Sequence, residues 1–76
     1  MSDLNISIDE NNILRLNSEV KTIDEIDSLI LEKIEAGEDP LIKVFADVKS
    51  EFSVFNNVLL LSKTHDLKLV IEQGEN

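Results

Sequence analysis

Alternating apolar and polar residues predict two strands near the N-terminus. Residues 4–9 alternate strictly, which is typical of a half-buried strand. Its inward side chains are expected to be Leu4, Ile6 and Ile8. A turn over residues 9–12 contains two asparagines, which tolerate left-handed backbone angles. Residues 13–16 then resume a strand, so we expect an antiparallel hairpin. Residues 17–18 interrupt the pattern, and Val20 is expected to point back into the core.

A helix is predicted over Ile23–Ala36 by the spacing of its apolar residues and by its end signals. Apolar residues recur at steps of three and four and form one broad face. They are Ile23, Ile26, Ile30 and Ile34, flanked by Leu29 and Leu31. Thr22 and Glu25 have the spacing of a capping box, in which each side chain accepts a hydrogen bond from the other residue's backbone amide. Gly37 and Pro40 are typical of a helix end.

The second half of the chain has the pattern of a strand, a helix and a strand. Residues 41–47 are a dense apolar run that is typical of a buried strand, and residues 67–71 are predicted to form a second strand. Between them, residues 53–65 have helical spacing, with one apolar face made by Val54, Phe55, Val58, Leu59 and Leu61. Ser50 or Ser53 is expected to cap this helix. Strands joined by such a crossover are parallel, and the crossover is almost always right-handed.

The order of these elements predicts an α+β fold. The layout β-β-α-β-α-β gives one two-layer domain over residues 1–76, with both helices on one face of a mixed sheet. One sheet face and at least one strand edge are then uncovered. An uncovered edge can pair with another strand, which favours dimerisation or the capture of an extended peptide. Residues 74–76 are expected to form a frayed tail.

Charge and composition narrow the classes of partner. The formal net charge is −9, which argues against a nucleic-acid partner. Residues 1–40 hold eleven acids and three bases, a net −8, whereas residues 41–76 hold five acids and four bases, a net −1. The acidic half either steers a basic partner or keeps a small domain soluble. The chain has no cysteine, so it has no disulfide and no thiol nucleophile.

Candidate chemistry is sparse along the chain. Asp47 ends the central strand, where ligands gather in open α/β sheets. It is either a base or metal ligand, or an acceptor for the amides of residues 48–51. His65 is the single histidine, and we expect it to be a surface or capping residue that gains from the helix dipole when charged. With no nucleophile paired to a base, and no calcium-loop spacing among the acidic residues, we expect no enzymatic activity, cofactor or metal.

Two apolar side chains are candidate partner contacts. Lys43 and Phe45 share one side of the central strand by alternation, and the lysine indicates that this side is not the deepest core. Phe45 therefore contacts a partner or packs against a neighbour within its own domain. Leu60 falls outside the apolar arc of the second helix, so it contacts a second subunit or is an isolated exposed leucine, which is common.

The chain from Leu4 to Glu72 resembles the periplasmic domain of the ExbD/TolR family, membrane-anchored subunits of proton-driven motors. In that family a strand ends in Ala-Asp, an aromatic residue follows at the start of a helix, and a last strand closes the unit. The matching positions are Ala46-Asp47, Phe52, residues 54–63 and residues 68–71. Upstream, the family's phrase is matched by Ile13 or Leu14 and by Leu16, Asn17 and Val20. Ser18 departs from it, because a glycine is common there.

The resemblance implies a non-enzymatic interaction domain of a motor driven by the proton-motive force. It implies a homodimer, an ExbB/TolQ-like polytopic membrane protein that conducts protons, and a TonB-like or Tol-Pal-like partner. The system would then serve TonB-dependent transport or a Tol-type envelope function. It also implies a periplasmic location and an inner-membrane anchor in a segment absent from this chain, which has no apolar run near the ~20 residues that cross a bilayer.

Four residues are the candidate partner-binding positions under this hypothesis. They are Phe45, Asp47, Phe52 and Leu60. The alternative is a soluble α+β regulatory or small-ligand-binding module that acts alone, with its site near Asp47 and no link to a membrane.

Overall fold

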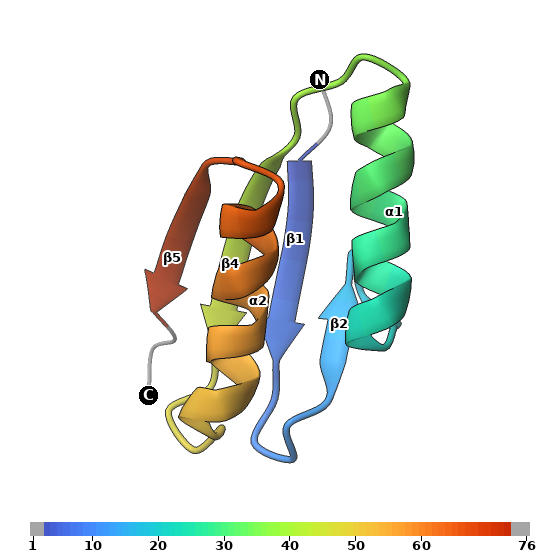
Figure 1. Ribbon diagram of the computed structural model, residues 1–76. Coiled ribbons are helices and arrows are strands. Elements are labelled where there is room, and N and C mark those ends of the chain that lie inside the picture. The colour runs from blue at the N-terminus through green and yellow to red at the C-terminus, as the bar shows by residue number, and fades with distance from the viewer. Residues whose placement is uncertain (1–2, 74–76) are drawn as a thin grey trace.

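The computed structural model describes residues 3–73 and has an α+β fold, as predicted (Figure 1). The elements, in chain order, are β1 (Asp3–Ile8), β2 (Leu14–Leu16), β3 (Glu19–Val20), α1 (Ile23–Glu35), β4 (Leu41–Ala46), α2 (Phe52–Thr64) and β5 (Leu69–Gln73). The tail expected at residues 74–76 lies outside the described residues. The sequence pattern did not predict the short strand β3.

The five strands form one mixed sheet in the order β3-β2-β1-β4-β5. β2 is antiparallel to both β1 and β3, which confirms the predicted hairpin. β4 is parallel to β1 on one side and to β5 on the other, so the predicted strand–helix–strand unit is present. β5 and β3 are the two edges of the sheet.

One face of the sheet, here called the core face, carries the hydrophobic core. The buried side chains that the strands supply are Leu4, Ile6, Ile8, Leu16, Ile42 and Val44. α1 adds Ile26 and Ile30 to the same cluster, and α2 adds Val58. Figure 1 shows α2 crossing in front of β4. Alternation along the strands, with a period of two, is what selects these positions.

The other face, here called the outer face, carries the alternate side chains of the strands. The register joins Val20 to Arg15, Arg15 to Ser7, Ser7 to Phe45 and Phe45 to Glu72 in one row. Directly paired residues point to the same side of a sheet. Val20 therefore lies on the outer face and is 63% exposed, so the prediction that it points into the core was wrong.

The first helix begins and ends close to where the sequence predicts. The Thr22 hydroxyl accepts a hydrogen bond from the Glu25 amide at 3.2 Å, and the Glu25 carboxylate accepts one from the Thr22 amide at 2.8 Å. The amide of Thr22 is the main reason that the pKa of Glu25 lies below its usual value. Gly37 follows with a φ of 85°, a left-handed conformation that costs glycine little.

The second helix starts differently from the prediction. Its N-cap is Glu51, which makes no side-chain capping bond. The prediction that Ser50 or Ser53 caps this helix was therefore wrong. The Ser50 hydroxyl instead donates to the Asp47 carbonyl at 2.6 Å. The Glu51 amide donates to Oδ1 of Asn12, at 2.6 Å, in the turn between β1 and β2. This cap is supplied by a distant turn rather than by the helix's own sequence.

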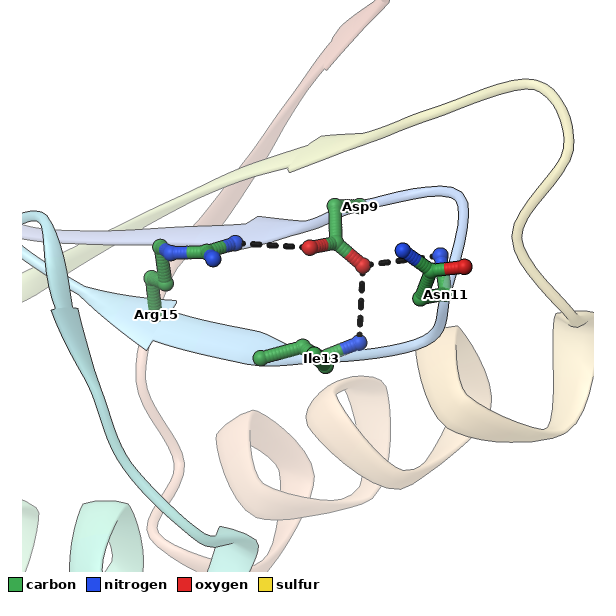
Figure 2. A network of polar contacts seen from close by, with 4 residues as sticks. All are labelled: Asp9, Asn11, Ile13 and Arg15. Carbon is green, nitrogen blue, oxygen red and sulfur yellow. Dashed lines mark hydrogen bonds and ion pairs between the residues drawn. The ribbon is translucent and has the colours of Figure 1, made fainter.

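The turn between β1 and β2 is organised by the carboxylate of Asp9 (Figure 2). It accepts hydrogen bonds from the amides of Asn11 and Ile13, at 2.8 and 3.0 Å, and pairs with Nη1 of Arg15 at 2.7 Å. The pKa of Asp9 lies below its usual value, mainly because of the hydrogen bond from the Arg15 side chain and next because of the one from the Ile13 amide. The ionised carboxylate is thus favoured by the folded turn.

Acid is expected to loosen this turn. A carboxyl whose pKa is lower in the folded state contributes stability above its unfolded pKa, and that contribution is lost as the pH falls through the folded pKa. For Asp9 this window lies below 3.8, its reference value. We expect the melting temperature to fall less steeply below that pH in Asp9→Asn than in the parent protein. Glu32→Gln, at an exposed position on α1, is the control. An equally flattened dependence of its melting temperature on pH would contradict the assignment of this effect to Asp9.

Candidate functional site

An open pocket of about 360 Å³ lies where β4 and β5 end and α2 begins. It is lined by Ala46, Val48, Ser50, Glu51, Phe52, Phe55, Ile71 and Glu72. The pairing of Val44 with Ile71 places Ile71 on the core face. The loop after β4 and the first turn of α2 contribute the aromatic and aliphatic residues that face it.

The walls of this pocket are apolar and exposed. Phe52 is 71% exposed, Val48 63% and Ile71 52%, although all three are large hydrophobic residues. The rings of Phe52 and Phe55 pack at a tilted angle of 50°, with their centroids 6.0 Å apart, a favourable arrangement for an aromatic pair. Exposed apolar residues that cluster in this way mark interaction sites more often than scattered ones do.

β5 forms the edge of the sheet beside the pocket (Figure 1). Within residues 3–73 it pairs with β4 alone, so its outer side presents unpaired backbone amides and carbonyls. Val70 and Ile71 on this strand are both exposed. A free edge is a template for another strand, and here it runs directly along an apolar pocket.

The charged residues that line the pocket are both acidic. Glu51 and Glu72 are exposed, and neither takes part in an ion pair within the described part of the chain. Glu51 therefore lines the pocket from the start of α2, whereas the pairing of Glu72 with Phe45 directs the Glu72 side chain to the outer face.

Asp47 lies beside the pocket but does not line it. Its carboxylate accepts a hydrogen bond from the Lys49 amide at 2.8 Å, and its carbonyl accepts from the amide and the hydroxyl of Ser50. These bonds agree with the interpretation of Asp47 as an acceptor for the loop after β4. Its contribution to the site is to shape the loop that carries Val48.

His65 makes a contact that the sequence did not predict. Nε2 of His65 lies 2.6 Å from Oδ1 of Asp27, and the imidazole side chain is 14% exposed. The contact joins the C-cap residue of α2 directly to α1. Among residues 3–73, no group of three or more histidine, cysteine or carboxylate residues is arranged to hold a metal ion.

The four predicted positions do not form one site. Phe52 lines the pocket and Asp47 supports its loop. Phe45 lies on the outer face, 39% exposed, in a second hollow shared with Asn5, Ser7, Asn17, Ser18 and Lys43. Leu60 is 50% exposed on α2, as its place on the helical wheel predicts, and lines neither hollow.

Sequence reasoning missed the pocket residues Val48, Phe55 and Ile71 as a group. Phe55 was predicted as core, and it does pack against the core cluster while also facing the pocket. Ile71 was predicted only to lie in the last strand. The signal that could have identified it is the strand order, because the last strand of a βαβ unit at an edge has a neighbour on one side only.

Comparison with known proteins adds no relative. No protein-family model matches the chain, and no curated protein matches it. Neither helix within the described residues has the length and apolar character needed to cross a membrane.

Proposed function

We propose that this chain is a protein–protein interaction domain that binds an extended segment of a partner along the edge of β5. The observation that carries the proposal is the unpaired edge of β5 beside the exposed apolar pocket. Strand addition uses main-chain hydrogen bonds for affinity and side-chain pockets for specificity, and this edge offers both. A pocket of this kind needs no catalytic group, so the proposed role is not enzymatic.

We further propose that the domain belongs to an ExbD/TolR-like subunit of a motor driven by the proton-motive force. Its support is the resemblance described above together with the α+β fold, in which Ala46 ends a central strand and Phe52 starts the next helix. On this proposal the domain lies in the periplasm, anchored through a segment outside this chain. An ExbB/TolQ-like protein would supply proton flow, and a TonB-like or Tol-Pal-like partner would receive the force.

The homodimer that the resemblance implies has a different surface available. The outer face of the sheet carries Phe45, Val20 and Val70 as exposed apolar residues. Pairing through this face would leave the edge of β5 free for the partner segment. Sedimentation equilibrium of the parent protein and of Phe45→Asp tests this part separately, since only the parent is expected to dimerise.

The proposal predicts that one surface substitution on β5 abolishes function while a matched one on α1 does not. Ile71→Asp places a carboxylate in the lining of the pocket, where a bound apolar side chain would bury this charge without a counter-charge. Leu31→Asp is the control, because Leu31 is 46% exposed and Ile71 is 52% exposed. Each variant replaces the chromosomal copy in the source cells.

The readouts are transporter-dependent uptake and resistance to detergent, which report TonB-type and Tol-type function respectively. We expect Ile71→Asp to lose one of these activities and Leu31→Asp to retain both, with equal protein levels on immunoblots and cooperative melting of both purified variants. Full activity of the folded Ile71→Asp variant in both assays would overturn the proposed role of β5 in the motor.

A small-ligand module is the second candidate, and the pocket's volume favours it. About 360 Å³ falls in the range of small-molecule sites, roughly 300–1,000 Å³. Such a site would bind an apolar metabolite next to Phe52 and Phe55. Stabilisation by a metabolite in a thermal-shift screen, lost in Phe52→Ser, would favour this candidate over strand addition.

A further inference from the structure

The free edge of β5 offers the backbone groups of alternate residues. The Ile42 amide donates to the Lys68 carbonyl at 3.1 Å, so the backbone of Lys68 faces β4. In an extended strand, the N–H and C=O groups of one residue point to the same side, and successive residues alternate. The amides and carbonyls of Leu69 and Ile71 therefore point away from the sheet, at an edge beyond which Figure 1 shows no other element. A strand added there would form its main-chain hydrogen bonds with these two residues.

β5 fits against a second copy of itself when the two strands are antiparallel and centred on Val70. This register sets Leu69 opposite Ile71 of the second copy, and Ile71 opposite Leu69. Each of these pairs can exchange main-chain hydrogen bonds, because both residues present their backbone groups to the edge. Val70 lies opposite Val70 of the second copy as a non-hydrogen-bonded pair, in agreement with a backbone that faces β4. The register is therefore compatible with the bonds that β5 already makes.

The apolar side chains match in this register. Ile71 is 52% exposed and points to the core face, where it would meet Leu69 of the second copy. Val70 is 44% exposed and points to the outer face, where it would meet its own counterpart. Both contacts remove apolar surface from water. Because the two-fold axis of such a pair is normal to the sheet, the core faces of both copies lie on the same side of one continuous sheet.

The charges at the edge favour this register over its neighbours. Lys68 and Glu72 lie on the outer face by alternation from Val70, and both are exposed. Neither takes part in an ion pair within residues 3–73. Centring on Val70 sets each Lys68 opposite a Glu72, and opposite charges directly across a strand pair stabilise a sheet. Centring on Leu69 would set Lys68 opposite Val70. Centring on Ile71 would set Glu72 opposite Val70, so either shift loses the charge pairs.

The overall charge of the chain limits the strength of this contact without preventing it. The formal net charge of −9 on each copy opposes the approach of a second copy. At physiological salt, however, exposed charges more than about 8 Å apart are largely screened, and the register brings together a lysine and a glutamate from each copy. One strand pair is a small contact. We therefore expect it to be weak in dilute solution and to form where two copies are held close together.

We infer that the edge of β5 pairs with β5 of a second copy, antiparallel and centred on Val70, when no partner segment occupies it. The two copies must then separate at this edge before a partner segment can bind, because one edge cannot hold two strands. This consequence rests on the strand addition proposed above, whereas the self-pairing does not. The contact also differs from the outer-face pairing, which Phe45→Asp is designed to remove.

Disulfide cross-linking tests the register, because the chain has no cysteine of its own. Opposed residues in a non-hydrogen-bonded pair have Cα atoms about 4.5 Å apart, a separation that a disulfide can span. Val70→Cys is therefore expected to form a dimer readily. Ile71→Cys, which would lie opposite Leu69, is expected to cross-link roughly tenfold more slowly. Val20→Cys, 63% exposed on β3, gives the rate of chance encounters. All variants carry Phe45→Asp and are oxidised with glutathione disulfide at near-millimolar protein concentration.

Charge reversal tests the pairing of Lys68 with Glu72. Added to Val70→Cys, either Lys68→Glu or Glu72→Lys turns the attractive pairs into repulsive ones and is expected to slow cross-linking roughly fivefold. An equal mixture of these two variants restores opposite charges across the strand pair, so cross-linking between unlike chains is expected to recover. Lys63→Glu on α2 and Glu32→Lys on α1 change the net charge by the same amounts at exposed positions, and are expected to leave the rate little changed.

Two results would overturn the inference. Equal cross-linking rates for Val70→Cys and Val20→Cys would remove the self-pairing. A fast rate for Val70→Cys that charge reversal does not alter would remove the register in which Lys68 meets Glu72. Each variant is checked for cooperative melting, and for one that fails, amide shifts of residues 68–72 on dilution of the Phe45→Asp chain give the same test. Neither result removes the proposed partner site, which fails only if folded Ile71→Asp keeps full activity in cells.

Discussion

Replacing Ile30 with alanine is expected to lower the free energy of unfolding by about 2–5 kcal/mol. Ile30 is fully buried at the middle of α1, in the same cluster as Ile6 and Val44 of the sheet. Alanine removes three carbon atoms from that cluster, and the cost depends on how far the surrounding side chains close the cavity that is left. In a domain of this size such a loss is a large share of the total stability, typically 5–15 kcal/mol.

Urea denaturation followed by circular dichroism measures this effect. Leu31→Ala is the control, because Leu31 is the next residue of the same helix and is 46% exposed. Its substitution is expected to change the stability by no more than about 0.5 kcal/mol, as is usual on a surface. Equal losses in the two variants would contradict the assignment of the core face of α1.

Replacing Asn12 with alanine is expected to cost about 2 kcal/mol. Asn12 has a φ of 65°, a left-handed conformation that costs an ordinary L-residue roughly 1–2 kcal/mol. Its Oδ1 also accepts the hydrogen bond from the Glu51 amide at 2.6 Å, which is the cap that α2 does not make for itself. Alanine loses this bond, worth about 0.5–1.5 kcal/mol, and takes on the backbone strain.

Asn12→Gly separates the two contributions. Glycine accepts the left-handed conformation but lacks the side-chain oxygen, so about half of the loss is expected to remain. Thermal or urea unfolding of both variants gives the comparison. A glycine variant as stable as the parent protein would mean that the bond to Glu51 contributes nothing, and the start of α2 would then need another explanation.

Local signals explain how much of the fold could be predicted from the sequence. Thr22, Glu25 and Gly37 act within one turn of α1, so they fix its ends without reference to the rest of the chain. The alternation in β1 predicts its buried positions for the same reason. The start of α2 could not be predicted in this way, because its capping oxygen comes from Asn12, 39 positions before Glu51.

Features that depend on strand order were beyond the sequence pattern. Val20 is apolar and follows a turn, yet the pairing of β3 with β2 sets it opposite Arg15 and places it on the outer face. Ile71 lies in a dense apolar run, yet β5 is an edge strand and α2 leaves this residue half exposed. The pocket joins residues from the loop after β4, the first turn of α2 and the end of β5, and only the folded chain brings these segments together.

The central claim is that this domain works in the periplasm as part of an anchored motor subunit, and cell fractionation tests it most directly. An antibody to the domain is used on immunoblots of source cells separated into cytosol and membranes. We expect a band larger than 8.6 kDa in the inner-membrane fraction, with the epitope open to protease only after the outer membrane is breached. A band of 8.6 kDa in the cytosol would contradict the motor and leave the pocket beside β5 to serve a soluble partner.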